Sequence, residues 1–593
     1  MATAQRLHAL REIMSARQYD ALIIPRADEY LGEYLPEHNE RLLWATGFTG
    51  SAGMAIVLKG GAAIFVDGRY TVQVRDQVDE TLFAYHHFID EPPVTWLGEQ
   101  LGEGAKVVCD PRLHSLAWFE QAKKVLARAG CELVADADNL IDNCWDDRPA
   151  PLVKQALLHQ QQYTGEHSRD KRARLGERLK QQKLDAALIF APDSVSWLLN
   201  IRGRDVPTLP IVQSFALLYP GGELSVFVDP ARIPEGFAEH VGDGVTVYAE
   251  QEAEAALTQL GGKNVLADPN SANAWTQLLL REGGATLVAG EDLALFPKAC
   301  KNAVEIEGAR QAHIRDGVAE VKFLHWLDSE VEAGRLHNEA LLADKLGAFR
   351  AEQALYQEPS FDTISAAGGN AAMPHYNHLN NPNPPNLSMD SIYLVDSGGQ
   401  YLDGTTDITR TVAIGRPDEQ VKQRFTLVLK GHIALDVARF PAGTNGGQLD
   451  VLARQFLWAQ GLDFDHGTGH GVGSFLSVHE APQRIAKRGG EAVLYPGMIL
   501  SNEPGYYKAG QYGIRCENLV VVTPPNDDET PMMGFEVLTM VPFDQRLIDV
   551  SLLSQSERNW VDRYHQQVYD TLSPLLDGEV LAWLTRATKP LAG

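Results

Sequence analysis

The chain has 593 residues and a formal net charge of −26, because 52 Lys and Arg stand against 78 Asp and Glu. Hydrophobic residues make up 44% and charged residues 22%, which excludes a mostly disordered chain. At roughly 150 residues per domain, the length predicts about four domains, within a range of three to five. The acidic balance argues against nucleic acid as a partner, and no apolar run approaches the ~20 residues that cross a bilayer, so we also expect no membrane partner.

The cysteines indicate a reducing compartment. They are odd in number, scattered and form no CxxC pair, so a disulfide framework is not expected. We therefore expect a large cytoplasmic protein. The five cysteines are Cys109, Cys131, Cys144, Cys300 and Cys516.

The first half of the chain contains a repeated helix–strand pattern. Apolar residues at helical spacing within 6–17 precede a strand-like run at 19–25. A second helical pattern at 175–179 precedes a similar run at 184–192. Residues 6–17 are Arg-rich, as in some targeting peptides, but the repeat favours the first helix of a domain.

Two further landmarks follow each strand in the same order. Trp44 and Trp197 each open a short apolar segment, and Phe-Val-Asp follows at 65–67 and at 227–229. The shared order indicates a duplication, with apolar β-rich runs alternating with amphipathic helices.

We therefore expect two related α/β domains, over residues 1–155 and 156–300. Neither carries a dense cluster of His and carboxylate residues, so we expect them to shape access or an oligomer interface. A third region, 301–593, opens with a long helical stretch and has a Pro/Asn-rich loop at 374–389, where regular structure is not expected. Residues 550–590 predict a terminal helical segment.

Two aspartates stand out among the strands expected at 392–414. Asp396 ends an otherwise apolar strand, and Asp407 sits in a Thr-rich strand soon afterwards. A carboxylate among buried strand residues is costly unless it is paired or bound to a metal. Either residue taken alone is also compatible with an ordinary turn or strand-end aspartate.

The segment DHGTGHGVGSFLSVHE contains His466, His470 and His479. A spacing of four between the first two would suit a zinc site on a helix, but glycines at every second position of 467–473 make a helix improbable. The glycines instead favour a loop or bent strand that approaches a site closely. The alternative is a flexible glycine loop with incidental histidines.

Two further segments place charged residues beside apolar runs. In GMILSNEPGYY, the following proline biases Glu503 towards extended geometry. In GIRCENLVVV, a period of two places Arg515 and Glu517 on one face of a single strand, and Cys516 on the other. A structural Arg–Glu pair is the alternative for this segment.

Together these segments supply four carboxylates and one imidazole. Clustered carboxylates repel each other and raise their pKa values, whereas two divalent cations cancel a charge of −4. An oxygen-rich set suits Mn²⁺ or Co²⁺ better than Zn²⁺, which stays an alternative. Two such metals can share a bridging hydroxide and polarise a carbonyl, so the pattern predicts metal-assisted hydrolysis. The expected ligands are Asp396, Asp407, His470, Glu503 and Glu517.

The order of these motifs carries a family resemblance. The segments HYNH, DSGGQYLDGTTDITRT, HGTGHGVGSFLSVHE, NEPGYY and GIRCEN resemble those of the pita-bread metallopeptidases, most specifically the aminopeptidase P branch. The resemblance covers essentially the whole chain. It implies an α/β and α+β multidomain fold, with two creatinase-type N-terminal domains and a pita-bread catalytic domain over 301–593 that ends in a helical segment.

The resemblance also implies an activity and residue roles. The five ligands would hold two metal ions, commonly manganese, and remove an N-terminal residue that precedes proline from a peptide. His375 and His466 match active-site histidines, and His479 matches one that stabilises the tetrahedral intermediate. Glu503 matches a proton acceptor as well as a ligand, and Arg515 matches an anchor beside the last ligand. Relatives of this long form imply a homodimer.

Five alternatives differ in their sequence requirements. Prolidase, which cleaves Xaa-Pro dipeptides, shares the metal set but usually has one N-terminal domain. A non-catalytic pita-bread binding module tends to lose ligands, and creatinase lacks the metal set. A serine hydrolase is weak because the segment at 49–53 lacks the first glycine of GxSxG, and Val472 breaks a dinucleotide-type GxGxxG.

Overall fold

The computed structural model describes residues 1–591 and divides into two compact units. The first unit comprises residues 1–158 and 166–294. The second comprises 159–165 and the chain from 295 onward, so a short piece of the early chain belongs to the later unit. None of the helices in residues 1–591 has the length and apolar character needed to cross a membrane.

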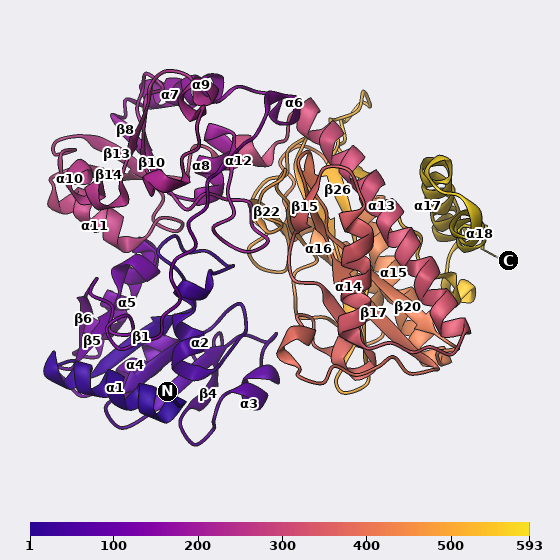
Figure 1. Cartoon of the computed structure of the whole chain (residues 1–593), viewed down its shortest axis with the longest axis horizontal. Helices are drawn as coiled ribbons and strands as arrows, with labels where there is room; N and C mark the ends of the chain where they lie inside the picture. Colours follow the sequence, from indigo (N-terminus) through magenta and orange to yellow (C-terminus); the bar gives the residue numbers. More distant parts are fainter. Residues whose placement is uncertain (592–593) are drawn as a thin grey trace. The chain divides into compact units, whose positions relative to one another are not determined.

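The first unit begins with an α/β domain around a six-stranded mixed sheet (Figure 1). Its strand order is β4-β3-β2-β1-β5-β6, in which β1 pairs antiparallel with β2 and parallel with β5. The expected helix at 6–17 is α1, Thr3–Ala16, whose buried leucines pack on this sheet. The strands are β1 Ala21–Pro25, β2 Met54–Leu58, β3 Ala62–Val66, β4 Ala84–His87, β5 Lys106–Cys109 and β6 Glu132–Ala135.

A second sheet in the same unit repeats this topology. Its order is β12-β11-β10-β8-β13-β14, and β8 pairs antiparallel with β10 and parallel with β13, as β1 does with β2 and β5. The two related α/β domains predicted from the repeated landmarks are thereby confirmed. The strands are β8 Ala186–Ile189, β10 Phe215–Leu218, β11 Leu224–Phe227, β12 Val245–Tyr248, β13 Asn264–Ala267 and β14 Thr286–Ala289.

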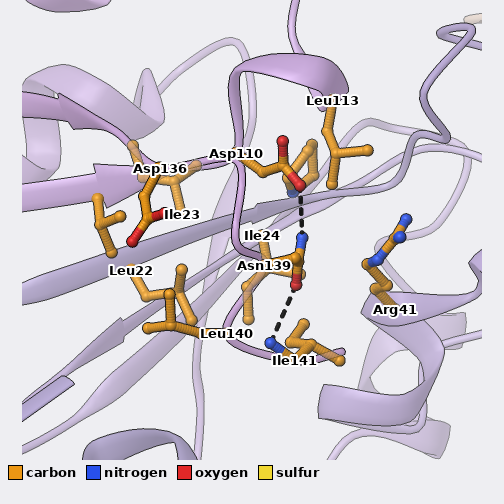
Figure 2. A pocket seen from close by; sticks show the side chains of 12 residues that line it. Leu22, Ile23, Ile24, Arg41, Asp110, Leu113, Asp136, Asn139, Leu140 and Ile141 are labelled. Carbon is orange, nitrogen blue, oxygen red and sulfur yellow. Dashed lines mark hydrogen bonds between the residues drawn. The ribbon is translucent and has the colours of Figure 1, made fainter. Parts of the chain in front are cut away.

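The first domain contains a small internal cavity at the ends of β1 and β5 (Figure 2). Asn139 joins the two sides of the cavity, because its amide donates to Asp110 (2.9 Å) and its carbonyl accepts the Ile141 N–H (2.9 Å). The volume of about 10 Å³ has room for a single water and is far below that of a substrate pocket.

The second unit is built from short sheets and long helices. Helix α13, Ala303–Glu332, is the predicted long helix and begins at the capping residue Asn302. The main sheets of the second unit are β16-β17-β20 and β22-β21-β23-β26-β27, and the smaller ones are β15-β18-β19 and β24-β25. The terminal helices α17, Gln555–Leu572, and α18, Gly578–Ala587, pack against α13 (Figure 1).

The remaining elements of this unit surround the two main sheets. The strands are β15 Tyr356–Pro359, β16 Ile364–Ala367, β17 Ser391–Ser397, β18 Gly399–Tyr401, β19 Gly404–Thr405, β20 Ile408–Ile414, β21 Gly469–Gly471, β22 Glu480–Ile485, β23 Ile499–Asn502, β24 Gly505–Lys508, β25 Tyr512–Arg515, β26 Asn518–Val522 and β27 Phe535–Val537. The helices are α12 Leu295–Ala299, α14 Glu339–Ala351, α15 Glu419–Asp436 and α16 Gly446–Trp458. The Pro/Asn-rich loop is irregular, as expected, apart from one short 3₁₀ turn, His378–Asn380.

Candidate metal centre

The two predicted aspartates lie side by side at the end of the β17–β20 pair. The antiparallel register places Asp396 opposite Thr409, and Asp407 lies two residues before Thr409 in the chain. The prediction that Asp407 lies within a strand was wrong by one residue, since β20 begins at Ile408. Both carboxylates are buried, as a metal site in a sheet requires.

His470 and Glu503 approach from the neighbouring sheet. His470 Nε2 lies 3.3 Å from Asp407 Oδ2 and 3.5 Å from Glu503 Oε1. Ser501 Oγ links the two strands, because it accepts the His470 backbone N–H (3.0 Å) and donates to Glu503 Oε1 (3.2 Å). A Cβ at Gly469 would overlap the Ser501 carbonyl oxygen, so this approach requires glycine. The prediction of a glycine-bent strand is confirmed.

Arg515 and Glu517 reach the site by a different route from the one predicted. They do not share a strand, because Arg515 ends β25 and Glu517 precedes β26, and these strands belong to different sheets. The Arg515 guanidinium donates to Asp396 Oδ2 (2.6 Å), and Thr409 Oγ1 donates to Glu517 Oε2 (2.6 Å). Cys516 turns into the hydrophobic core, away from the site, as expected.

The carboxylates strain one another electrostatically. Burial and the nearby Asp396 charge raise the pKa of Asp407 well above its ordinary value. Burial and the charges of Asp407, Asp396 and Glu503 do the same to the pKa of Glu517. Burial raises the pKa of Glu503 to about 7, although His470 and Arg515 oppose the shift. A single cationic side chain, Arg515, does not neutralise this cluster.

The donor set fits divalent cations. One ligand atom from each of Asp407, His470 and Glu517 lies within 4.8 Å of the others, which is the spacing of a shared metal. Asp396 Oδ1 is buried and has no hydrogen-bond partner among residues 1–591. A buried carboxylate oxygen without a donor is costly, and a bound cation would remove that cost.

The three predicted active-site histidines lie around this cluster. The rings of His470 and His479 are edge-to-face, with centroids 4.3 Å apart. His466 Nε2 lies 2.6 Å from the Tyr507 hydroxyl. His375 follows Pro374, whose carbonyl accepts a hydrogen bond of 3.4 Å from Arg515. The chain therefore brings all the predicted residues to one region.

Tyr507, Thr409 and Ser501 are parts of the site that sequence reasoning missed. Tyr507 is the most connected, because its hydroxyl lies against His466 and accepts from the Arg515 guanidinium (2.7 Å). The sequence offered one signal for Tyr507 as a site residue, which is its position between the candidate residues Glu503 and Arg515. Thr409 and Ser501 gave none, since a hydroxyl in a strand is usually a structural group.

We expect Tyr507→Phe to lower kcat by about 10-fold while the protein stays folded. The change removes only the hydroxyl that joins His466 to Arg515, and hydrogen bonds that orient active-site groups typically contribute 10–100-fold. Steady-state kinetics and thermal unfolding check this result. Tyr506→Phe, on the adjacent residue, is the matched control. Equal kcat values for Tyr507→Phe and wild type would contradict the role assigned to this hydroxyl.

Comparisons with known proteins cover the whole chain. Residues 307–524 match the model of the family "Metallopeptidase family M24". Residues 531–591 match the model of the "C-terminal region of peptidase_M24". "Creatinase/Prolidase N-terminal domain" matches twice, at 6–144 and at 147–305.

Full-length relatives agree with these family matches. The chain is 39% identical to a protein of Coccidioides posadasii named "Probable Xaa-Pro aminopeptidase P", over 99% of each chain. It is also 39% identical to a Laccaria bicolor protein of the same name, over 99% of this chain and 94% of that one. The solved X-prolyl aminopeptidase of Caenorhabditis elegans, described as a cytosolic enzyme with a di-nuclear active site, has a TM-score of 0.95, 34% identity and 100% coverage of both chains.

Fold and site together are those of a metal-dependent peptidase. Because the relatives match over the full length, the chain belongs to the Xaa-Pro aminopeptidase P branch of metallopeptidase family M24.

Proposed function

We propose that the chain hydrolyses the peptide bond between an N-terminal residue and a following proline. The observation that carries this function is the buried cluster of carboxylates around His470, in a chain that matches Xaa-Pro aminopeptidases from end to end. The residues Asp396, Asp407, His470, Glu503 and Glu517 would hold two divalent cations, with manganese as our first choice and cobalt or zinc as alternatives. When bound, such cations polarise the scissile carbonyl and lower the pKa of water.

The residues around the cluster supply the proton and positioning steps. Glu503 would be ionised when it holds the cations, and as a carboxylate it is suited to accept a proton during the reaction. His479, beside His470, is placed to donate to the oxygen that becomes negative in the transition state. Arg515 fixes Asp396, and Tyr507 fixes His466, so the site is held from two sides.

Proline explains why this bond needs a dedicated site. The bond before proline has no N–H, and the ring fixes φ, so ordinary backbone recognition of the substrate fails. A site for this bond must therefore bind the free α-amine and the ring on either side of the carbonyl. We propose that His375 and His466 lie beside the substrate in this arrangement.

The decisive experiment compares a tripeptide with a dipeptide. The metal-stripped chain, reloaded with Mn²⁺, is expected to release arginine from Arg-Pro-Pro. Cleavage of an Xaa-Pro dipeptide without cleavage of Arg-Pro-Pro would instead favour a prolidase. No cleavage of either peptide would favour a binding module and overturn the proposal.

Three further properties belong to this proposal. We propose domain boundaries near residues 155 and 300, a homodimer in solution, and a cytoplasmic location. Two observations support the location: the Caenorhabditis elegans protein is described as cytosolic, and the cysteines of this chain are scattered and unpaired. Light scattering coupled to size-exclusion chromatography tests the dimer.

A further inference from the structure

A fully buried charge cluster lies directly behind His479. The next residue, Glu480, has no exposed surface at its side chain, and it pairs with Lys298 and Lys301, whose side chains are each 1% exposed. Lys298 Nζ lies 2.8 Å from Glu480 Oε1, and Lys301 Nζ donates to Oε2. Both carboxylate oxygens are therefore fixed by charged donors.

Burying three charges is expensive, and apolar residues of similar volume often stabilise a protein as well or better. Both lysines donate to Glu480, which is not one of the expected metal ligands. The cluster therefore calls for an explanation other than stability, and its position supplies one.

The backbone at Glu480 determines where His479 lies. Glu480 is the first residue of β22 and pairs with Gly471, the neighbour of His470. A Cβ at Gly471 would overlap the Glu480 carbonyl oxygen, so the two strands are in close contact at this point. Next to this pairing, the His479 ring lies edge-to-face against that of His470.

The chain before His479 contacts residues 159–165, the early segment that belongs to this unit. Phe475 has a left-handed backbone conformation (φ 49°), which is unfavourable for a bulky residue and is held by its surroundings. The His159 ring packs edge-to-face on Phe475, with centroids 5.4 Å apart, and His159 Nε2 lies 2.6 Å from the Leu402 carbonyl oxygen. Residues 159–165 and 295–301 thus contact the His479 loop from its two ends.

We propose that Lys298 and Lys301 act through Glu480 as positioning residues for His479. This inference rests on the proposed role of His479 in the reaction. Charged hydrogen bonds are directional, so they hold the Glu480 backbone, and with it His479, more exactly than apolar packing would. A displacement of about 1 Å at a catalytic group can reduce the rate by about 100-fold.

The test uses the full-length, Mn²⁺-loaded protein with Arg-Pro-Pro as substrate. Glu480→Gln keeps the shape of the side chain but removes its charge, and we expect kcat to fall about 10-fold or more with KM within about twofold of wild type. The triple variant Lys298→Met/Glu480→Gln/Lys301→Met removes the three charges of this cluster. We expect its Tm to exceed that of Glu480→Gln, while its kcat stays about 10-fold or more below wild type.

Two controls separate the possible failures. His479→Ala, measured first, must lower kcat; if it does not, the proposed role of His479 fails rather than the positioning role. Lys171→Met removes another buried lysine, which donates to Trp197 O (2.9 Å) and Asn200 Oδ1 (2.7 Å) in the first unit, and should lower Tm but leave kcat unchanged.

Either of two results would overturn the inference. One is a kcat for Glu480→Gln within about twofold of wild type while His479→Ala is slow. The other is a triple variant that recovers kcat together with Tm, which would show that the cluster serves stability alone. If Glu480→Gln fails to fold, the triple variant decides the question.

Discussion

Asp407→Asn is expected to lower kcat/KM for Arg-Pro-Pro by about 1,000-fold or more and to reduce the content of bound metal. Asp407 lies at the centre of the cluster, 3.3 Å from His470 and within the three-residue group that also contains Glu517. Asparagine keeps the volume but removes the negative charge that a divalent cation requires. Losing several kcal/mol of metal-dependent stabilisation corresponds to at least three orders of magnitude in rate.

Asp436→Asn is the matched control for this result. Asp436 is also a buried aspartate of the second unit, with a pKa raised to about 7 by burial, but its partner is the indole N–H of Trp560 (2.7 Å). It should keep its activity and its metal content, measured by elemental analysis of dialysed protein. Full metal content in Asp407→Asn would contradict the ligand assignment, and full activity would overturn the metal centre as the site of the reaction.

The sequence predicted those features that repeat or that combine several residue types. The duplicated landmarks around Trp44 and Trp197 identified the two sheets, because each repeat buries its own core. The glycines around His470 identified a bent strand, because helix formation there would be costly. Five potential ligands in one region pointed to metals, since no apolar environment tolerates them without cations.

The sequence did not predict contacts made by unremarkable residues. A period-of-two pattern cannot show where a strand ends, and Arg515 and Glu517 turned out to lie on either side of a change of sheet. Tyr507 reads as an ordinary strand aromatic until the fold places its hydroxyl between His466 and Arg515. Such contacts depend on tertiary packing, and the local sequence shows only that Tyr507 lies in a segment between two candidate residues.

Removing the metal is expected to make stability depend strongly on pH. In the metal-free chain the pKa of Glu503 rises from 4.5 to about 7, and those of Asp407 and Glu517 rise well above their ordinary values, in each case mainly through burial. Between the ordinary pKa values of the unfolded chain and the raised pKa values of the folded chain, the folded state therefore binds more protons than the unfolded state. Below about pH 4.5 these groups are protonated and the metal-free fold keeps its full stability. As the pH rises through about 7 the groups ionise and the free energy of unfolding falls, by about 3 kcal/mol for Glu503 alone.

The metal-loaded protein should show the opposite trend, because cations bind only the deprotonated carboxylates. The difference in Tm between Mn²⁺-loaded and chelator-treated protein should therefore grow from about pH 5 to about pH 8 in scanning calorimetry.

His432 and His565 are buried with pKa values lowered to about 3, so they stabilise the fold as pH rises and partly mask the effect in the metal-free chain. Comparing metal-free wild type with metal-free Glu503→Gln cancels the contribution of the two histidines, since both proteins contain them. A metal-free profile with the same slope in wild type and Glu503→Gln would show that Glu503 is not part of a strained carboxylate cluster, and would count against the dinuclear site.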